Sequence, residues 1–272
     1  MTRTERDPGA SLHVLPPERR RTDAARTRIR RGVYLLPSLF TMANMFCGYA
    51  CVVYAMRGDF ATAAPFIGFA IVLDMLDGRI ARLTGSTSDF GIEFDSLADV
   101  VSFGVAPAIL CFAWGLQPLG RLGWAAGFVY LAAAAVRLAR FNIQSAVQDK
   151  RYFAGMPSPA AAAVPAATVF AYPAGFSGMA SALPALALMV VPALLMVSTI
   201  RFRSFKTIDL HSRRSYPVLL LLALGLALLT AQPELVLVAM AYAYLVSPAV
   251  GFAWSRLRQR PPAAETHDAP AP

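Results

Sequence analysis

Eight apolar segments follow one another along this chain, and each is about as long as a helix that crosses a membrane. They lie at residues 33–56, 61–83, 95–116, 122–143, 157–175, 183–200, 217–231 and 235–253. A spanning helix needs roughly 17–25 residues, and an open sheet cannot satisfy its backbone hydrogen bonds in lipid. We therefore expect an all-α integral membrane protein with about eight transmembrane helices.

The composition excludes a soluble globule. Only 15% of the residues are charged and 57% are hydrophobic, whereas about a quarter of a typical soluble domain is charged. The net charge of +9 could suggest a nucleic-acid partner. However, the basic residues fall between the apolar segments rather than along one face, so we expect membrane lipids and no nucleic acid.

The distribution of charge predicts the orientation. If the N-terminus is inside, every lysine and arginine except Arg57 and Arg121 lies on the inside. The positive-inside rule then places both termini in the cytoplasm. Residues 1–32 form an arginine-rich N-terminal segment, read either as an interfacial helix that binds anionic headgroups or as a topology signal without a binding role. We expect residues 33–253 to form one transmembrane domain and residues 254–272 a disordered cytoplasmic tail.

Four aspartates at the ends of two neighbouring spans need an explanation, because a charge inside a membrane costs several kcal/mol. Helical spacing puts the first two aspartates, Asp74 and Asp77, on one face. The same face carries Gly78, Ala81 and Arg82. The other two aspartates, Asp95 and Asp99, share a face of the next helix with Gly91 and Ser102. The connection over residues 83–90 is short and rich in Gly, Ser and Thr, so the two helices should be antiparallel neighbours.

Four carboxylates this close together cannot all remain ionised without cations between them. Arg79 and Arg82 are too few to neutralise them, and oxygen ligands without nearby His or Cys favour Mg²⁺ or Mn²⁺ (or Ca²⁺) over zinc. Two such ions suit an in-line displacement at phosphorus. The competing interpretation, in which the aspartates only pair with arginines, explains a single residue better than four on matched faces.

These residues resemble the signature of a known family. The pattern D-x2-D-G-x2-A-R-x8-G-x3-D-x3-D is matched without a gap by Asp74, Asp77, Gly78, Ala81, Arg82, Gly91, Asp95 and Asp99. It is similar to that of the CDP-alcohol phosphatidyltransferases. The resemblance implies a six-helix core over about residues 33–206, followed here by two extra C-terminal helices. It also implies a homodimer in a bacterial inner membrane, with the active site facing the cytoplasm.

The resemblance further implies roles for individual residues. The metal ligands would be Asp74, Asp77, Asp95 and Asp99, holding two Mg²⁺ or Mn²⁺ ions, and Asp99 would also be the general base. CDP would be bound by Asp77, Gly78, Ala81, Arg82 and Gly91, with Thr41 from the first helix.

Several stretches resemble the phosphatidylserine synthase branch of the family. They are LPSLFTMANMFCG (36–48), DSLADVVSFGVAPA (95–108), RLARFN (137–142), FAGMPSPAAAA (153–163) and STIRFRSFK (198–206). Ser38 departs from the branch, which carries Asn there. The implied reaction transfers the phosphatidyl group of CDP-diacylglycerol to L-serine and releases CMP. Arg137 and Arg140 are candidates for the serine carboxylate or a phosphate, because guanidinium binds both in a bidentate manner.

Three alternatives remain open at this point. The same fold could use another acceptor, glycerol 3-phosphate or inositol phosphate. An intramembrane prenyltransferase also holds a diphosphate through aspartates and Mg²⁺. A cation transporter would place carboxylates in the membrane as well, but it should show inverted repeats or helices broken at mid-membrane.

Overall fold

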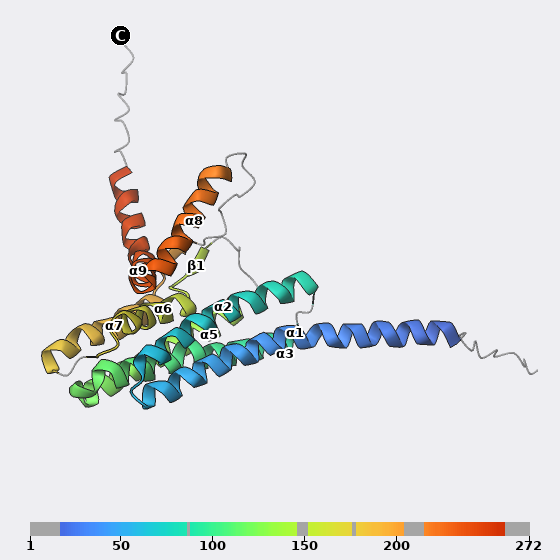
Figure 1. Ribbon diagram of the computed structural model, residues 1–272, viewed down its shortest axis with the longest axis horizontal. Helices are drawn as coiled ribbons and strands as arrows, with labels where there is room; N and C mark the ends of the chain where they lie inside the picture. Colours follow the sequence, from blue (N-terminus) through green and yellow to red (C-terminus); the bar gives the residue numbers. More distant parts are fainter. Residues whose placement is uncertain (1–16, 86–87, 146–151, 176–177, 204–214, 259–272) are drawn as a thin grey trace, which may run out of the picture.

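The structure is a computed structural model that describes residues 17–85, 88–145, 152–175, 178–203 and 215–258, and helices dominate it (Figure 1). The α-helices are α1 Pro17–Met56, α2 Phe60–Thr84, α3 Asp89–Asp99, α4 Ala106–Cys111, α5 Arg121–Ser145, α6 Ser158–Ala171, α7 Met179–Val197, α8 Ser215–Ala231 and α9 Pro233–Arg258. Between them lie the π-helical segments η1 Val100–Val105 and η2 Phe112–Leu116, and the 3₁₀ segment η3 Gln117–Leu119.

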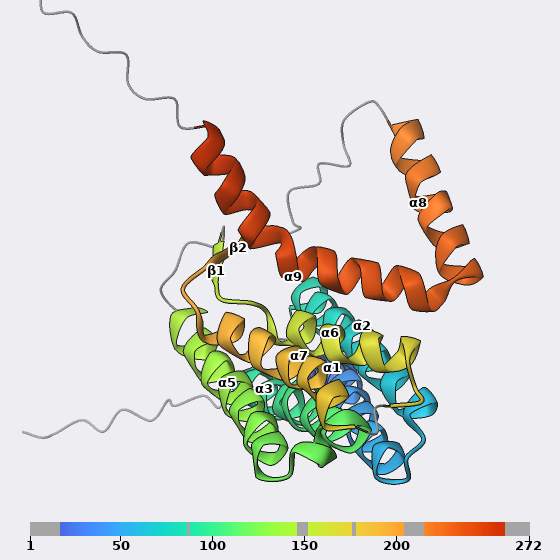
Figure 2. The same cartoon turned by 90° about the vertical axis from the view of Figure 1, so that its left-hand side faces the viewer.

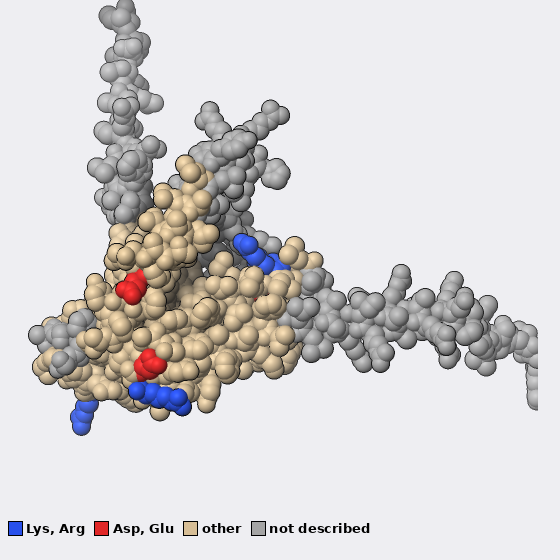
Figure 3. All heavy atoms as spheres, in the orientation of Figure 1, with Lys and Arg blue, Asp and Glu red and all other residues tan. Residues whose placement is uncertain are grey.

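Within the described residues, four continuous helical spans are long and apolar enough to cross a membrane: Pro37–Met56, Phe60–Leu83, Asp89–Leu119 and Arg121–Ile143. Shorter apolar helices cover Ser158–Ala171, Ala182–Val197 and Pro233–Pro248. The visible described surface is almost uncharged (Figure 3), and many large apolar side chains such as Phe46, Trp124 and Leu183 are exposed on it. Such a surface is stable in lipid rather than in water. The expected helical membrane protein is confirmed, while the count of eight spans and their orientation remain predictions.

Helix α1 organises the part of the fold that carries the aspartates. It packs along α2 and also against α3, η1 and α4, whereas α2 and α3 barely contact each other directly. The predicted short connection between α2 and α3 is present, and their acidic side chains meet, although the two backbones make few close contacts with each other. The two helices are held together largely by their shared contact with α1.

Small residues allow the helices to approach closely. The buried core is rich in alanine, with a few large side chains such as Phe103, Leu110 and Tyr130 between them. Small residues at helix contacts are typical of membrane proteins, where close van der Waals packing replaces the hydrophobic effect. Around this core α5 packs against α7, and α6 packs against both α2 and α9.

Two short strands, which the sequence analysis did not predict, join distant parts of the chain. β1 Tyr152–Ala154 pairs antiparallel with β2 Arg201–Arg203, with Phe153 opposite Phe202. Gly155, with φ +85°, follows β1 at a point where a Cβ would collide with the Met196 carbonyl. The pairing therefore brings the residues just before α6 next to the residues that follow α7.

The outermost helices differ from the predicted boundaries. Residues 17–32 continue the first span in one helix that projects beyond the body (Figure 1), and headgroup binding by this segment stays a prediction. α8 packs against α9 and stands away from the other helices, while α9 bends along its length (Figure 2) and contains Pro248. α9 runs to Arg258, past the predicted start of the tail at residue 254. Residues 259–272 lie outside the described part of the chain.

Candidate active site

The turn between α2 and α3 sets the position of the aspartates. α2 ends at Gly85, whose φ of +60° is a left-handed conformation that glycine adopts without strain, and the Gly85 N–H bonds to the Ala81 carbonyl. Ser88 then caps α3 by accepting a hydrogen bond from the Gly91 N–H at 3.0 Å. These two caps stop one helix and start the next within a few residues, so both aspartate pairs lie within a few helical turns of the connection.

The predicted carboxylates do converge. Asp74, Asp95 and Asp99 each offer an oxygen that lies within 4.8 Å of the others. Asp77 is only 2% exposed, and its carboxyl group lies within hydrogen-bonding reach of Asp95. The two helices thus place four acidic groups in one cluster, as the spacing in the sequence predicts.

This cluster fits a divalent cation. Its donors are all carboxylate oxygens, which Mg²⁺ and Mn²⁺ prefer. In addition, Asp95 Oδ1 is buried and has no hydrogen-bond partner among the described residues. A buried carboxylate oxygen without a partner carries a large desolvation penalty, which a bound cation would remove. The assignment of individual ligands remains a prediction.

Helix α1 adds two polar side chains to the cluster. Thr41 Oγ1 lies 2.9 Å from Asp77 Oδ2 and 3.1 Å from the Pro37 carbonyl, and it donates to one of them at a time. Asn44 Nδ2 donates to Asp99 Oδ1 at 3.2 Å. The sequence predicts Thr41 as a nucleotide contact, whereas Asn44 is a site residue that was not predicted. The signal was available, because Thr41 and Asn44 lie three residues apart on one face of an otherwise apolar span.

The candidate nucleotide residues form an open strip on the last turns of α2. A Cβ added to Gly78 would meet only the Arg82 guanidinium, at 3.9 Å. Arg82 is exposed, and its Nε donates to the Gly78 carbonyl at 2.7 Å. Ala81, which lies between Gly78 and Arg82 in the sequence, is partly buried. The strip therefore leaves backbone accessible next to Asp77, although CDP binding by these residues stays a prediction.

The two candidate arginines have different surroundings. Arg137 donates from Nη1 to Ser158 Oγ at 2.6 Å, and its guanidinium lies over the Phe141 ring, 5.8 Å from the centroid. It also interacts electrostatically with Asp74 and Asp99. Arg140 Nη1 instead lies 3.4 Å from the carbonyl of Val197 at the end of α7. Of these two arginines, Arg137 is the one with an observed electrostatic link to the acidic cluster.

The last helix, for which no catalytic part is predicted from the sequence, contacts α6 and interacts with Arg137. Tyr242 on α9 lies 3.1 Å from Thr168 on α6, hydroxyl to hydroxyl. Tyr244, half-buried on the same helix, interacts electrostatically with Arg137. α9 thus brings Tyr244 within electrostatic range of Arg137.

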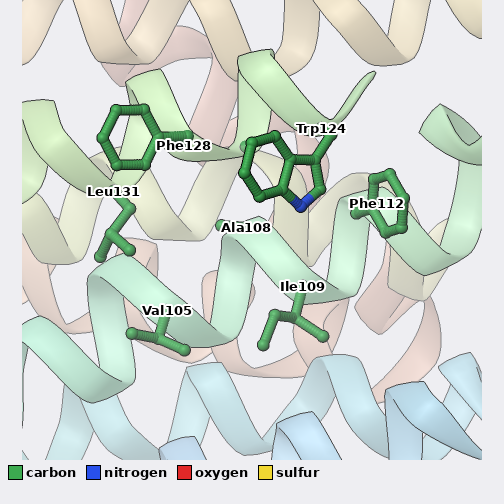
Figure 4. A pocket seen from close by; sticks show the side chains of 8 residues that line it. Val105, Ala108, Ile109, Phe112, Trp124, Phe128 and Leu131 are labelled. Atoms are coloured by element: carbon green, nitrogen blue, oxygen red, sulfur yellow. The ribbon is translucent and has the colours of Figure 1, made fainter. Parts of the chain in front are cut away.

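A separate cavity of about 290 Å³ lies between α4 and α5 (Figure 4). Its lining is apolar and comes from Val105, Ala108, Ile109, Phe112, Trp124, Gly127, Phe128 and Leu131. It offers no ligand for a metal or a nucleotide.

Gly123 and Gly127 have the spacing of a helix-dimer motif, but both lie at contacts within the chain. A Cβ on Gly123 would collide with the Leu116 carbonyl, and one on Gly127 would meet the Ala108 carbonyl at 3.7 Å.

Comparison with known proteins supports the interpretation of the site. The family model for CDP-alcohol phosphatidyltransferase matches residues 34–201. The chain is 39% identical over 197 residues to a CDP-diacylglycerol–serine O-phosphatidyltransferase of Helicobacter pylori (strain ATCC 700392 / 26695), covering 71% of this chain and 81% of the relative. It is 41% identical over 145 residues to the enzyme of the same name from Mycobacterium leprae (strain TN), covering 51% and 48%.

A third relative is an archaetidylserine synthase of Methanothermobacter thermautotrophicus, which is 33% identical over 169 residues, covering 61% of this chain and 69% of the relative. The matched region of the family model contains the acidic cluster, the α1 contacts and Arg137. The chain belongs to the CDP-alcohol phosphatidyltransferase family.

Proposed function

We propose that the protein transfers the phosphatidyl group of CDP-diacylglycerol to the hydroxyl of L-serine, giving phosphatidylserine and CMP. The observation that carries the proposal is the convergence of Asp74, Asp95 and Asp99 within 4.8 Å in a chain whose relatives bear serine-transferase names. Family membership removes the prenyltransferase and transporter alternatives.

The reaction is a direct displacement at phosphorus. The serine hydroxyl oxygen bonds to the phosphorus that carries diacylglycerol, the anhydride bond to CMP breaks, and its electron pair leaves with CMP. Asp99 accepts the hydroxyl proton, because a serine hydroxyl is a poor nucleophile until a base takes its proton. Two Mg²⁺ or Mn²⁺ ions, held by the four aspartates, would supply positive charge that stabilises the diphosphate and the departing CMP.

Arg137 is the better candidate for the serine carboxylate. Its guanidinium is held by Ser158 and Phe141 and is electrostatically linked to Asp99, the proposed base. An acceptor with its hydroxyl at Asp99 therefore has a cation nearby for its carboxylate. Arg140 Nη1 instead contacts the Val197 carbonyl, so we propose no substrate role for this residue. For the nucleotide, we propose the strip of Gly78, Ala81 and Arg82 beside Asp77, with Gly91 and Thr41 at its edges.

The membrane topology belongs to the same proposal. We infer that both termini and the active site face the cytoplasm of a bacterial inner membrane, because nearly all basic residues then lie inside. A homodimer is proposed from the family resemblance. The apolar described surface is compatible with either a lipid or a protein neighbour.

The test is an acceptor comparison. The purified protein receives CDP-diacylglycerol and Mn²⁺ with L-serine, glycerol 3-phosphate or inositol phosphate, and CMP release is followed. We expect release with serine and little with the phosphorylated acceptors. Release with glycerol 3-phosphate but not with serine would leave the family assignment intact and overturn the acceptor.

A further inference from the structure

Asn44 is a primary amide buried in the membrane-spanning part of α1. Its side chain is 0% exposed. Transfer of an amide from water to an apolar environment without hydrogen bonds costs roughly 2–7 kcal/mol. The residue therefore needs partners that offset this cost, and the identity of those partners indicates what it does.

The donor side of the amide contacts the acidic cluster. Asn44 Nδ2 donates to Asp99 Oδ1 at 3.2 Å. Because an ionised carboxylate only accepts hydrogen bonds, this contact fixes which end of the amide faces Asp99. Asn44 Oδ1 is then left over, buried and without a hydrogen-bond partner among the described residues. An amide kept only for helix packing would be expected to satisfy both of its ends.

The backbone around Asn44 is fixed against the segment that follows Asp99. Ser102 lies three residues after Asp99 in the π-helical segment η1, is fully buried, and donates from Oγ to the Asn44 carbonyl at 2.9 Å. One turn further along α1, Gly48 lies so close that a Cβ there would be 2.7 Å from Ser102 Cα. π-helical turns inside helices occur frequently at functional sites. These contacts hold Asn44 opposite Asp99.

We propose that Asn44 is a positioning residue that orients the Asp99 carboxylate for phosphatidyl transfer, an inference that rests on the proposed function. The amide holds Oδ1 of Asp99 and so leaves Oδ2 for the acceptor hydroxyl. Mutation of a side chain that orients a metal ligand through a hydrogen bond typically costs about 10–100-fold in metal affinity or activity. A purely structural Asn44 would instead affect only the amount and stability of the folded protein.

A double-mutant cycle separates these two roles. Asn44→Leu keeps the branching at Cγ and removes the amide, and Asn44→Ala serves if the leucine variant does not fold. Each is made in the wild type and in Asp99→Asn. Tyr242→Phe is the matched control, because it removes another helix–helix hydrogen bond, between α9 and α6, without touching the acidic cluster. The measurements are kcat for CMP release, KM for CDP-diacylglycerol, CMP affinity with Mn²⁺ by calorimetry, and the apparent Tm.

If Asn44 acts through Asp99, its loss lowers kcat by about 10–100-fold, while CMP affinity changes by less than about threefold. In the Asp99→Asn background the same change lowers kcat by less than about threefold, because the interaction it removes is already altered. Tyr242→Phe lowers at most the apparent Tm.

Wild-type kcat in folded Asn44 variants, or a full loss repeated in the Asp99→Asn background, would overturn the inference. The cycle is run with whichever acceptor supports CMP release, so a wrong acceptor does not affect it. Absence of CMP release by the wild type with every acceptor would refute the proposed function and this inference with it. An active wild type with unimpaired Asn44 variants refutes the inference alone.

Discussion

Gly48 is the position at which a single methyl group should disturb the active site most. A Cβ there would lie 2.6 Å from Ser102 Oγ and 2.7 Å from Ser102 Cα, whereas ordinary contacts begin at 3.4 Å. A rotamer change can move Oγ but not the backbone Cα, so α1 and η1 must separate in Gly48→Ala. Relieving the backbone contact requires a shift of about 0.7 Å, which is the difference between the two distances.

That shift has a consequence for the site as well as for stability. Overpacking of this kind typically costs about 1–3 kcal/mol. The same displacement of α1 would lengthen the Asn44–Asp99 contact from 3.2 Å toward about 3.9 Å, beyond hydrogen-bonding distance. Because misplacement of a reacting group by about 1 Å can cost 10²-fold in rate, we expect kcat to fall by about 10–100-fold with a lower apparent Tm.

The assay compares Gly48→Ala with Gly68→Ala in detergent, by thermal unfolding and by CMP release. Gly68 on α2 has nothing within 4 Å of an added Cβ, and alanine favours a helix over glycine by about 1 kcal/mol. The control should therefore keep wild-type kcat and an equal or higher Tm. A Gly48→Ala enzyme with wild-type Tm and kcat would refute the close contact between α1 and η1.

Three further predictions concern the acidic cluster and the arginines. EDTA should abolish CMP release, and Mg²⁺ or Mn²⁺ should restore it. Replacement of one metal-ligand candidate should remove both turnover and tight CMP binding, and the variants to test are Asp74→Ala, Asp77→Ala and Asp95→Ala. Full activity of any one of these variants would contradict the metal site. Asp99→Asn should lower kcat by about 10²–10⁴-fold, the usual range for general base catalysis, with a smaller loss of CMP affinity than Asp74→Ala; equal losses of affinity would make Asp99 chiefly a ligand. Arg137→Lys should raise the serine KM, because a point charge replaces a planar fork, while Arg140→Lys should not, since lysine can still donate to the Val197 carbonyl; the reverse pattern would exchange their roles.

The aspartate cluster could be predicted from the sequence because its information is local. Asp74 and Asp77 lie on one helical face, as do Asp95 and Asp99, and the short connection limits how the two faces can meet. The apolar segments likewise predict spans, since lipid leaves few other options for the backbone.

The parts that could not be predicted depend on contacts between distant helices. Arg137 and Arg140 are three residues apart on one helix, and their different surroundings become visible only through contacts with distant residues such as Ser158 and Val197. The close approach of α1 to η1 depends on Gly48 meeting Ser102, which no local pattern reveals. The β1–β2 pair is only three residues long on each side, too short for an alternating pattern to be recognised.

The most direct test of the proposed transfer follows the oxygen of the serine hydroxyl. L-Serine labelled with ¹⁸O in its side-chain hydroxyl is incubated with the protein, CDP-diacylglycerol and Mn²⁺, and both products are analysed by mass spectrometry. Direct attack on the phosphorus that carries diacylglycerol predicts that phosphatidylserine retains the label and that CMP contains none. Formation of phosphatidic acid with a cytidylyl-serine, or of phosphatidylserine that has lost the label, would contradict the account.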